Sequence, residues 1–322
     1  MASSLSEAKT NKIIKAKYQP KSALKKIMSC WQLCLLMLIP FIYIIVFKYV
    51  PMYGATIAFK KFMPLKGIMG SPWIGFENFQ RLFESPSFLG LLKNTIILSL
   101  YGLFAGFPFP IILALCLNYM GRERFKKVVQ MTTYIPHFIS VVVTVGLLFQ
   151  ILSLRTGVVN NVIELLGGER TNFIADPGFF RHLYVWSGIW QNAGWGSIIY
   201  IAALSSIDPQ LHEAAIMDGA SKVRRIWHID LPGILPTVVI MLILNAGGIL
   251  TTGFEKVLLM QNPLNSVTSE VIDTYVYKVG IAAQLPNYSF ASAVGLFQSV
   301  VTFSLTVFVN FISKKVSENS LW

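Results

Sequence analysis

Six long apolar stretches constrain the fold of this 322-residue chain more than any other feature. An α-helix of roughly 20 predominantly apolar residues crosses the hydrocarbon core of a bilayer. Only 13% of the residues are charged, about half the share in a typical soluble domain. These features exclude a compact soluble enzyme and predict an all-α integral membrane protein with six transmembrane helices. The expected helices are residues 27–47, 94–117, 128–152, 183–204, 234–255 and 289–312.

The basic residues indicate the orientation of the chain. Six spans place both termini on one side, together with the second and fourth loops. The segments on that side are 1–26, 118–127, 205–233 and 313–322. They carry 16 of the 27 Lys and Arg residues, although they contain fewer residues in total than the loops on the opposite side. Cytoplasmic loops carry the excess of Lys and Arg. We therefore expect a multi-pass protein of the cell (plasma) membrane with both termini cytoplasmic.

The N-terminal segment, 1–26, is expected to be a cytoplasmic basic tail. Its lysines either contact anionic membrane lipid or serve only as a solvated topology signal. The apolar run that follows is longer than the core of a typical signal peptide, and no small-residue cleavage site comes after it. The run is therefore expected to be an uncleaved first span. The net charge is +12. The Lys and Arg residues that produce it lie in short segments beside the apolar runs and form no basic surface with stacking aromatic residues, so no nucleic-acid partner is expected.

Residues 27–93 are expected to hold this first span and an external interfacial segment. Phe76, Phe79 and Phe83 have the spacing of one helix face. Aromatic rings gather at the headgroup level of a membrane. A helix in the outer interface is therefore expected, with a simple anchor as the alternative.

The most informative segment is the cytoplasmic loop at 205–233. Asp208 and Pro209 form a helix start, with Asp as the N-cap and Pro at the first helical position. Gly219 is expected to end this short helix, and Ser221 to open a second amphipathic helix that ends at Leu231–Pro232. The loop is thus predicted to be two short helices joined at a glycine.

The loop contains the pattern E-A-A-x3-G-x9-I-x-L-P in full. The matching residues are Glu213, Ala214, Ala215, Gly219, Ile229, Leu231 and Pro232. This pattern resembles the coupling loop of the membrane subunits of ATP-binding-cassette (ABC) importers. The resemblance implies a type I importer permease fold with a core at 94–312 and a cytoplasmic C-terminal tail at 313–322. It also implies that the glutamate pairs with a basic group of an ATPase, that the alanines permit close packing, and that the glycine makes the turn.

Other stretches extend the resemblance to the sugar branch of these permeases. Similarity to maltose-type permeases is carried by Tyr134–Ser140, Ala175–Pro177 and the run from Gly253 to Pro263. Met52–Ala55, Ile57–Lys60 and the later Gly-Ser-Pro-Trp look like the branch that handles polysaccharide fragments. The resemblance therefore implies import of a sugar, expected to be an oligosaccharide or polysaccharide fragment.

The resemblance also implies the partners. They are a second homologous permease subunit in a heterodimer, two ABC ATPase subunits and an extracellular solute-binding protein that delivers the sugar substrate. The chain has no GxxxxGK[ST] nucleotide loop. We therefore expect a non-catalytic membrane subunit without a cofactor of its own, whose partners bind the ATP. The three cysteines lack paired CxxC spacing, so no metal site is expected.

Polar residues inside the expected spans are candidates for a substrate pathway, because such residues usually face the interior of a bundle or a water-filled cavity. Aromatic faces suit the C–H groups of a sugar, and amides suit its hydroxyls. The candidates are Trp190, Gln191, Asn192, Asn245, Thr252 and Glu255. Resemblance to maltose-type permeases favours Gln191 and Asn192 most. The alternative is helix packing by interhelical hydrogen bonds and interfacial tryptophans.

Two other functions remain open. An ion-coupled secondary transporter or channel would be favoured by an inverted repeat with intramembrane carboxylates, but Glu255 is the one carboxylate near a span. His137 follows Pro136, where a packed histidine is favoured over a proton relay. The second alternative is an ABC importer of a non-sugar solute, against which the extra first span and long external segment argue.

Overall fold

The computed structural model describes residues 31–248, 250 and 252–316, and within this part of the chain the regular structure is helical. The one sheet-like feature among these residues is an isolated β-bridge between Lys60 and Trp73. The predicted basic tail, 1–26, lies outside the described residues, as does 317–322 of the predicted C-terminal tail. The chain divides into two compact units, one up to Thr56 and one from Ile57 onward.

The first unit is an apolar helix. It comprises α3 (Trp31–Ile44), the π-helical turn η1 (Ile45–Tyr49) and α4 (Val50–Met52). None of the residues in these elements is buried; Leu36, for example, is 71% exposed. An apolar helix with no buried face needs an apolar environment outside its own chain. The bilayer provides that environment.

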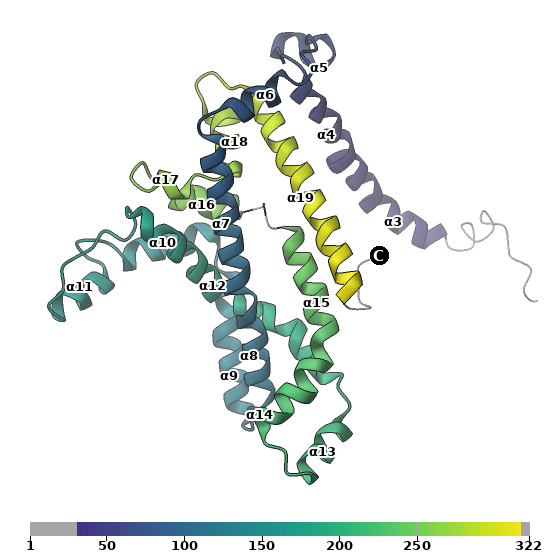
Figure 1. The fold of residues 1–322 in the computed structure, drawn as a ribbon, viewed down its shortest axis with the longest axis vertical. Coiled ribbons are helices and arrows are strands. Elements are labelled where there is room, and N and C mark those ends of the chain that lie inside the picture. The colour runs from purple at the N-terminus through teal and green to yellow at the C-terminus, as the bar shows by residue number, and fades with distance from the viewer. Residues whose placement is uncertain (1–30, 249, 251, 317–322) are drawn as a thin grey trace, which may run out of the picture. The chain divides into compact units, whose positions relative to one another are not determined.

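The second unit is built around long helices (Figure 1). They are α7 (Phe88–Gly106), α8 (Pro108–Asn118), α9 (Glu123–Tyr134), α10 (Val141–Ile151), α12 (Pro177–Ser205), α15 (Leu231–Gly247) and α19 (Tyr288–Val316). Helix α12 packs against α7, α8, α9 and α15. At its crossing with α9, a Cβ on Gly194 would overlap the carbonyl of Thr133, so only glycine permits this approach. Helix α12 is therefore the central element of the unit.

Short helices connect and cap the long ones. They are η2 (Tyr53–Phe59), which spans the unit boundary, η3 (Pro64–Lys66), α5 (Gly67–Gly70), α6 (Glu77–Glu84), η4 (Ile135–Phe138), α11 (Val158–Leu165), α13 (Pro209–Met217), α14 (Lys222–Arg225), η5 (Ile226–Asp230), α16 (Phe254–Met260), α17 (Ser266–Ser269), α18 (Ile272–Tyr277) and η6 (Lys278–Ala282). The predicted aromatic helix is present as α6. Its buried side is formed by Asn78 and Leu82, whereas Phe76 and Phe83 are 67% and 55% exposed.

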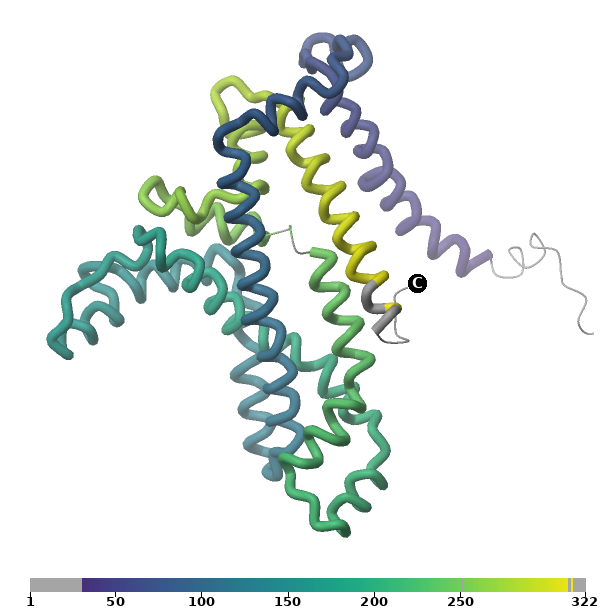
Figure 2. Tube along the Cα trace, viewed as in Figure 1, coloured from purple at the N-terminus to yellow at the C-terminus, as the bar shows by residue number. Residues whose placement is uncertain are grey.

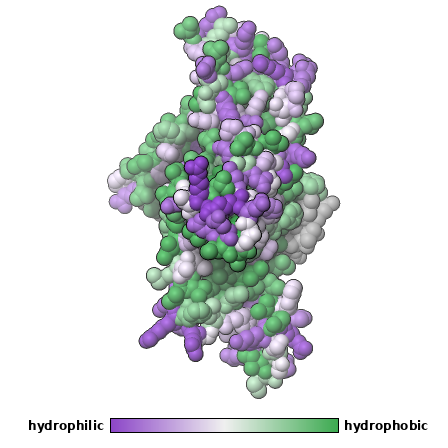
Figure 3. All heavy atoms as spheres, turned by 90° about the vertical axis from the view of Figure 1, so that its left-hand side faces the viewer, coloured by the Kyte–Doolittle hydropathy of each residue, from purple (hydrophilic) through white to green (hydrophobic). Residues whose placement is uncertain are grey.

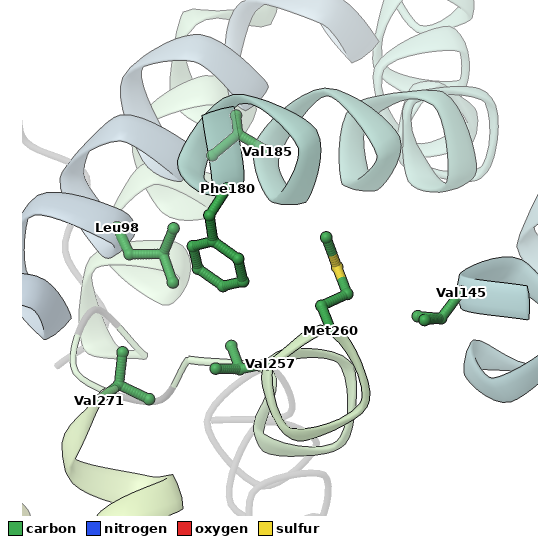
Figure 4. Packing of buried hydrophobic residues seen from close by; sticks show 7 residues of the cluster. All are labelled: Leu98, Val145, Phe180, Val185, Val257, Met260 and Val271. Carbon is green, nitrogen blue, oxygen red and sulfur yellow. The ribbon is translucent and has the colours of Figure 1, made fainter. Parts of the chain in front are cut away.

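Three hydrophobic clusters hold these helices together. The largest joins α7, α10, α12 and α16, and Figure 4 shows Phe180 of α12 beside Leu98 of α7, with its ring toward Val257 of α16. Tyr200 and Leu204, at the other end of α12, pack with Ala114 and Ile234. The third cluster joins α6, α7, α18 and α19. Outside these clusters much of the apolar surface is exposed, and Figure 3 shows a hydrophobic region above a lower end that carries hydrophilic residues.

The membrane-spanning helices agree only in part with the predicted six. Among the described residues, four runs are long and apolar enough to cross a bilayer: Trp31–Phe59, Phe88–Asn118, Lys222–Gly247 and Tyr288–Phe311. A fifth is counted if the bent pair Glu123–Phe138 and Val141–Ile151 is one span. Helix α12 has 29 residues but does not qualify, because amides and glycines interrupt its apolar sequence.

The helix predicted at 128–152 is not continuous. Its two halves are bent by 103° where η4 meets α10 (Figure 2). Pro136 occupies the first turn of η4, and Ser140 adopts an extended conformation in which its hydroxyl caps α10 by accepting the Val143 N–H at 3.3 Å. An extended residue interrupts the helical run, and as an N-cap it starts a new helix in another direction. The apolar periodicity of the sequence does not reveal such a break.

Candidate coupling loop and translocation cavity

The loop after α12 begins as the sequence predicts. Asp208 caps α13, and its Oδ1 accepts the N–H of Gln210 at 2.9 Å, with Pro209 in the first turn. Gly219 follows the helix with a φ of 72°. The Ala220 N–H donates to the Ala215 carbonyl at 2.8 Å, and the Gly219 N–H donates to the Ile216 carbonyl at 3.0 Å. This is the Schellman pattern, in which a left-handed residue ends a helix.

The second half of the loop differs from its prediction. Ser221 caps α14 as expected, with its hydroxyl 3.4 Å from the N–H of Arg224. The helix does not end at Leu231–Pro232, however, but continues through η5 into α15 as one run (Figure 2). In η5 the Leu231 N–H bonds to the Ile226 carbonyl, five residues back. This π-helical turn lets Pro232 occupy the first turn of α15, where its missing N–H is tolerated.

The motif residues lie at the tip and base of this loop. Glu213, Ala214, Gly219 and Pro232 are exposed, and Ala215, Ile229 and Leu231 are partly buried. Large apolar side chains of the same loop are also uncovered: Leu211, Ile216, Met217, Val223 and Trp227 are 53–87% exposed. Exposed apolar side chains gathered in one segment mark an interaction surface. The tip of the loop is therefore suited to docking another protein.

A buried polar cluster braces the base of the loop. Asp230 is fully buried; the Tyr119 hydroxyl donates to its Oδ2 at 2.6 Å, and Nε2 of His212 lies 3.4 Å from its Oδ1. The guanidinium of Arg225 lies 5.4 Å from the centroid of the Tyr119 ring. Burial, together with the bond to Asp230, raises the pKa of Tyr119 to about 12, so its hydroxyl keeps the donated proton at neutral pH. The cluster joins the end of α8, helix α13 and η5.

Sequence reasoning did not single out this cluster. Asp230 occupies the unspecified position of the I-x-L-P motif, and Tyr119 lies 111 residues earlier. The available signal was a carboxylate within an otherwise apolar motif, because such a group needs a partner when it is buried.

A cavity of about 860 Å³ lies further along α12. Its walls come from α7, α8, the turn before α10, α12, α15 and the start of α16. It contains four of the six predicted pathway residues, and its polar or charged side chains include His137, Gln191, Asn192, Asn245, Glu255 and Lys256. Helix α12 thus contributes both to the cavity and, at its C-terminus, to the start of the coupling loop.

The two adjacent amides of α12 have different surroundings. Gln191 is only 7% exposed, and its Nε2 donates to the Ile139 carbonyl at 2.9 Å and to Thr144 Oγ1 at 3.3 Å. It therefore supports the bend between η4 and α10. Asn192 is exposed, with its Oδ1 3.1 Å from His137 Nδ1. The His137 ring stacks on Trp195 at a centroid distance of 4.7 Å, which fixes the plane of the imidazole beside the amide.

The other candidates are divided among three sites. Asn245 and Glu255 are exposed in the large cavity. Thr252 is 5% exposed, donates to Asp273 Oδ2 at 3.2 Å, and lines an adjoining pocket of about 180 Å³ that Asn245 also lines. Trp190 is 53% exposed and lines a separate apolar pocket, so the structure does not bring it into the cavity with Gln191.

Comparison with known proteins agrees with this arrangement. The family described as "binding-protein-dependent transport system inner membrane component" matches residues 106–318. The chain is 44% identical over 310 residues to the polygalacturonan/rhamnogalacturonan transport system permease protein YteP of Bacillus subtilis (strain 168), covering 96% of each chain. It is 44% identical over 288 residues to protein LplB of the same organism, covering 89% of this chain and 90% of LplB.

The fold is also similar to a solved structure. A chain in the crystal structure of a bacterial ABC transporter, involved in the import of the acidic polysaccharide alginate, matches with a TM-score of 0.85 and 40% sequence identity. The match covers 92% of this chain and 100% of that chain. The helical core, the coupling motif and these similarities lead to one conclusion: the chain belongs to the family of binding-protein-dependent transport system inner membrane components.

Proposed function

We propose that this chain is a permease subunit of an ATP-driven importer that carries an oligosaccharide or polysaccharide fragment across the plasma membrane. The observation that carries the proposal is the junction on α12 between a polar cavity and a capped, protruding coupling loop. The sugar cargo is supported by the relatives, whose names specify polygalacturonan/rhamnogalacturonan and alginate. The chain is a non-catalytic subunit, and ATP hydrolysis belongs to separate subunits.

The assembly would contain a second homologous permease subunit, two ABC ATPases and an external solute-binding protein. The alginate transporter has been crystallised in complex with a pentasaccharide-bound periplasmic protein, which supports delivery by such a protein. Glu213 would meet a basic group of the ATPase, with Ala214 and Ala215 against its surface and Gly219 at the turn. Ile229, Leu231 and Pro232 would join the loop to α15.

Transport requires a structural element that can occupy two discrete positions. Both the ATPase and the substrate in the cavity must be able to shift the equilibrium between these positions. The loop has the rigidity for this role, because a side-chain cap, a Schellman end and a buried cluster each fix part of it. Since α12 ends at the loop and the run Lys222–Gly247 begins in it, a shift of the loop would move both helices together. Both helices line the cavity, which would then open to one side or the other.

We assign six spans to the chain by adding α12 and the bent α9–α10 pair to the four helical runs that qualify alone. The assignment is supported by the 29-residue length of α12 and its central packing. The distribution of Lys and Arg supports cytoplasmic termini. The permease core would be 94–312, preceded by the first span and external segment at 27–93 and flanked by tails at 1–26 and 313–322.

The test is uptake by the complete transporter in proteoliposomes with its binding protein outside. Labelled oligogalacturonate should accumulate only with ATP inside, and an ATPase subunit disabled in hydrolysis should stop accumulation. Uptake that persists without hydrolysis but stops when ion gradients are collapsed would identify an ion-coupled carrier instead. ATP-dependent uptake of a non-sugar solute, with no sugar among the ligands bound, would overturn the sugar assignment.

A further inference from the structure

Lys256 is a buried cation at the wall of the cavity. Its side chain belongs to α16 and is 8% exposed. The ammonium donates to the Tyr184 carbonyl at 3.1 Å and lies 5.0 Å from the centroid of the Tyr184 ring. A Cβ placed on Gly188, another lining residue, would stand 3.5 Å from Nζ. The ammonium is therefore at the surface of α12 that faces the cavity.

No carboxylate of the chain neutralises this ammonium within the part that the structure describes. The ion pairs found there join Arg170 with Glu164, His212 with Asp230, and Lys278 with Glu270. Glu255, the next residue to Lys256, is exposed and forms no ion pair with it. An ammonium has three N–H donors, and a carbonyl and a ring face compensate it only in part. Burial of an unpaired charge is costly, which indicates a ligand that supplies the missing negative charge.

The lining of the cavity indicates which anion this is. Among its lining residues, Lys256 is the one lysine or arginine and Glu255 the one carboxylate. The cavity therefore has no surplus of positive charge for a dianionic phosphate, and its single ammonium matches a single carboxylate better. The ring of His137 and the amide of Asn192, two other lining residues, suit the C–H groups and hydroxyls of a sugar ring. We infer that Lys256 binds the carboxylate of an acidic sugar unit as the saccharide passes through the cavity. This assignment rests on the proposed sugar import and defines the substrate class at the same site.

The competing explanation is that Lys256 only joins α16 to α12 through Tyr184. A joining role affects every substrate alike, whereas a carboxylate site affects only acidic ones. The test compares trigalacturonate with its fully methyl-esterified form, which has the same length and hydroxyls but no charge. Both are supplied with the binding protein saturated, and ATP-dependent uptake is measured in proteoliposomes of the complete transporter.

Lys256→Met should slow uptake of trigalacturonate about tenfold, equivalent to about 1.4 kcal/mol, and leave uptake of the ester within about twofold of wild type. Lys256→Arg, which keeps the charge, should restore part of the rate for the acid. Lys278→Met is the matched control, since Lys278 pairs with Glu270 at 2.9 Å and does not line the cavity; it should change neither rate. Basal ATPase activity and complex yield verify assembly, and Lys256→Gln serves if the methionine variant does not assemble.

Equal slowing of both sugars in Lys256→Met, or no slowing of the acid, overturns the carboxylate site while leaving sugar import intact. Preference of the wild type for the ester also overturns it. Wild-type uptake of neutral oligosaccharides but of neither of these two sugars also overturns the carboxylate site alone, whereas ATP-dependent uptake of no sugar contradicts the proposed sugar import itself.

Discussion

Glu213 stands at the tip of the coupling loop among exposed apolar side chains and belongs to no ion pair within the described residues. In the assembled transporter we expect it to meet a basic group of the ATPase. Glu213→Arg should insert normally but lose substrate-stimulated ATPase activity and uptake, since disrupting a partly buried charge pair costs roughly 3–5 kcal/mol. The matched control is Glu123→Arg, an exposed glutamate at the start of α9. Wild-type coupling in Glu213→Arg would contradict the assigned role.

The Tyr119 hydroxyl donates a hydrogen bond of 2.6 Å to the buried carboxylate of Asp230. Tyr119→Phe removes one hydrogen bond to a charged acceptor and should lower the free energy of unfolding by about 1.5–3 kcal/mol. Because its pKa is raised from 10.0 to about 12, this stabilisation is complete below pH 10.0 and is lost as the pH rises toward 12. Thermal unfolding in detergent measures it, with Tyr49→Phe, 64% exposed, as control. Equal melting temperatures would show that the bond contributes nothing.

Gln191 and Asn192 are adjacent, but the structure separates their expected effects. Asn192→Ala should slow substrate uptake while leaving complex yield and basal ATPase activity near wild type, because its amide is exposed in the cavity. Gln191→Ala should instead lower thermal stability by about 1–3 kcal/mol, since it leaves buried groups at the bend unpaired. The double variant should show both losses. Reduced assembly in Asn192→Ala would make it a packing residue.

At the scale of elements, the coupling loop depends on one left-handed residue. Gly219 has a φ of 72°, and no atom lies near the position of an added Cβ, so strain and not crowding opposes substitution. Gly219→Val should cost roughly 1–3 kcal/mol of local stability and weaken association with the ATPase. Gly121→Val is the control, because Gly121 lies in another turn with open space and no positive φ. Co-purification with the ATPase measures the effect, and equal yields for both variants would show an ordinary turn.

Helix α12 shows how a central helix of a membrane protein can lack an apolar composition. Its polar positions are used inside the second unit, where Ser197 donates to the Gly194 carbonyl and Gln191 bonds across to the bend. Only the lipid-facing surface of a buried helix must be apolar. For this reason α12 is less apolar than the four helical runs that are apolar enough to cross a bilayer, although it packs at the centre of the unit.

At the scale of the whole molecule, six spans and cytoplasmic termini predict which loops face outward. With the native cysteines replaced by serine, Glu169→Cys in the loop before α12 should react with an impermeant maleimide in intact cells. Glu123→Cys, at the start of α9, should react only after the membrane is opened. Both positions are exposed, so reactivity reports the side of the membrane. Labelling of Glu123→Cys in intact cells would reverse the orientation, and labelling of both would change the number of spans.

The sequence by itself determined the features that depend on a few neighbouring residues. Apolar length indicated the helices, Asp208 and Pro209 defined the start of α13, and Gly219 defined its end, because caps are hydrogen bonds within one turn. Tertiary structure decided the bend at Ser140, the continuation of the loop into α15, and the exclusion of Trp190 from the cavity. It also paired Tyr119 with Asp230 and placed Lys256 on Tyr184, which is 72 residues earlier. Such contacts depend on which helices pack together, and this is fixed by burial over the whole chain and not by any local pattern.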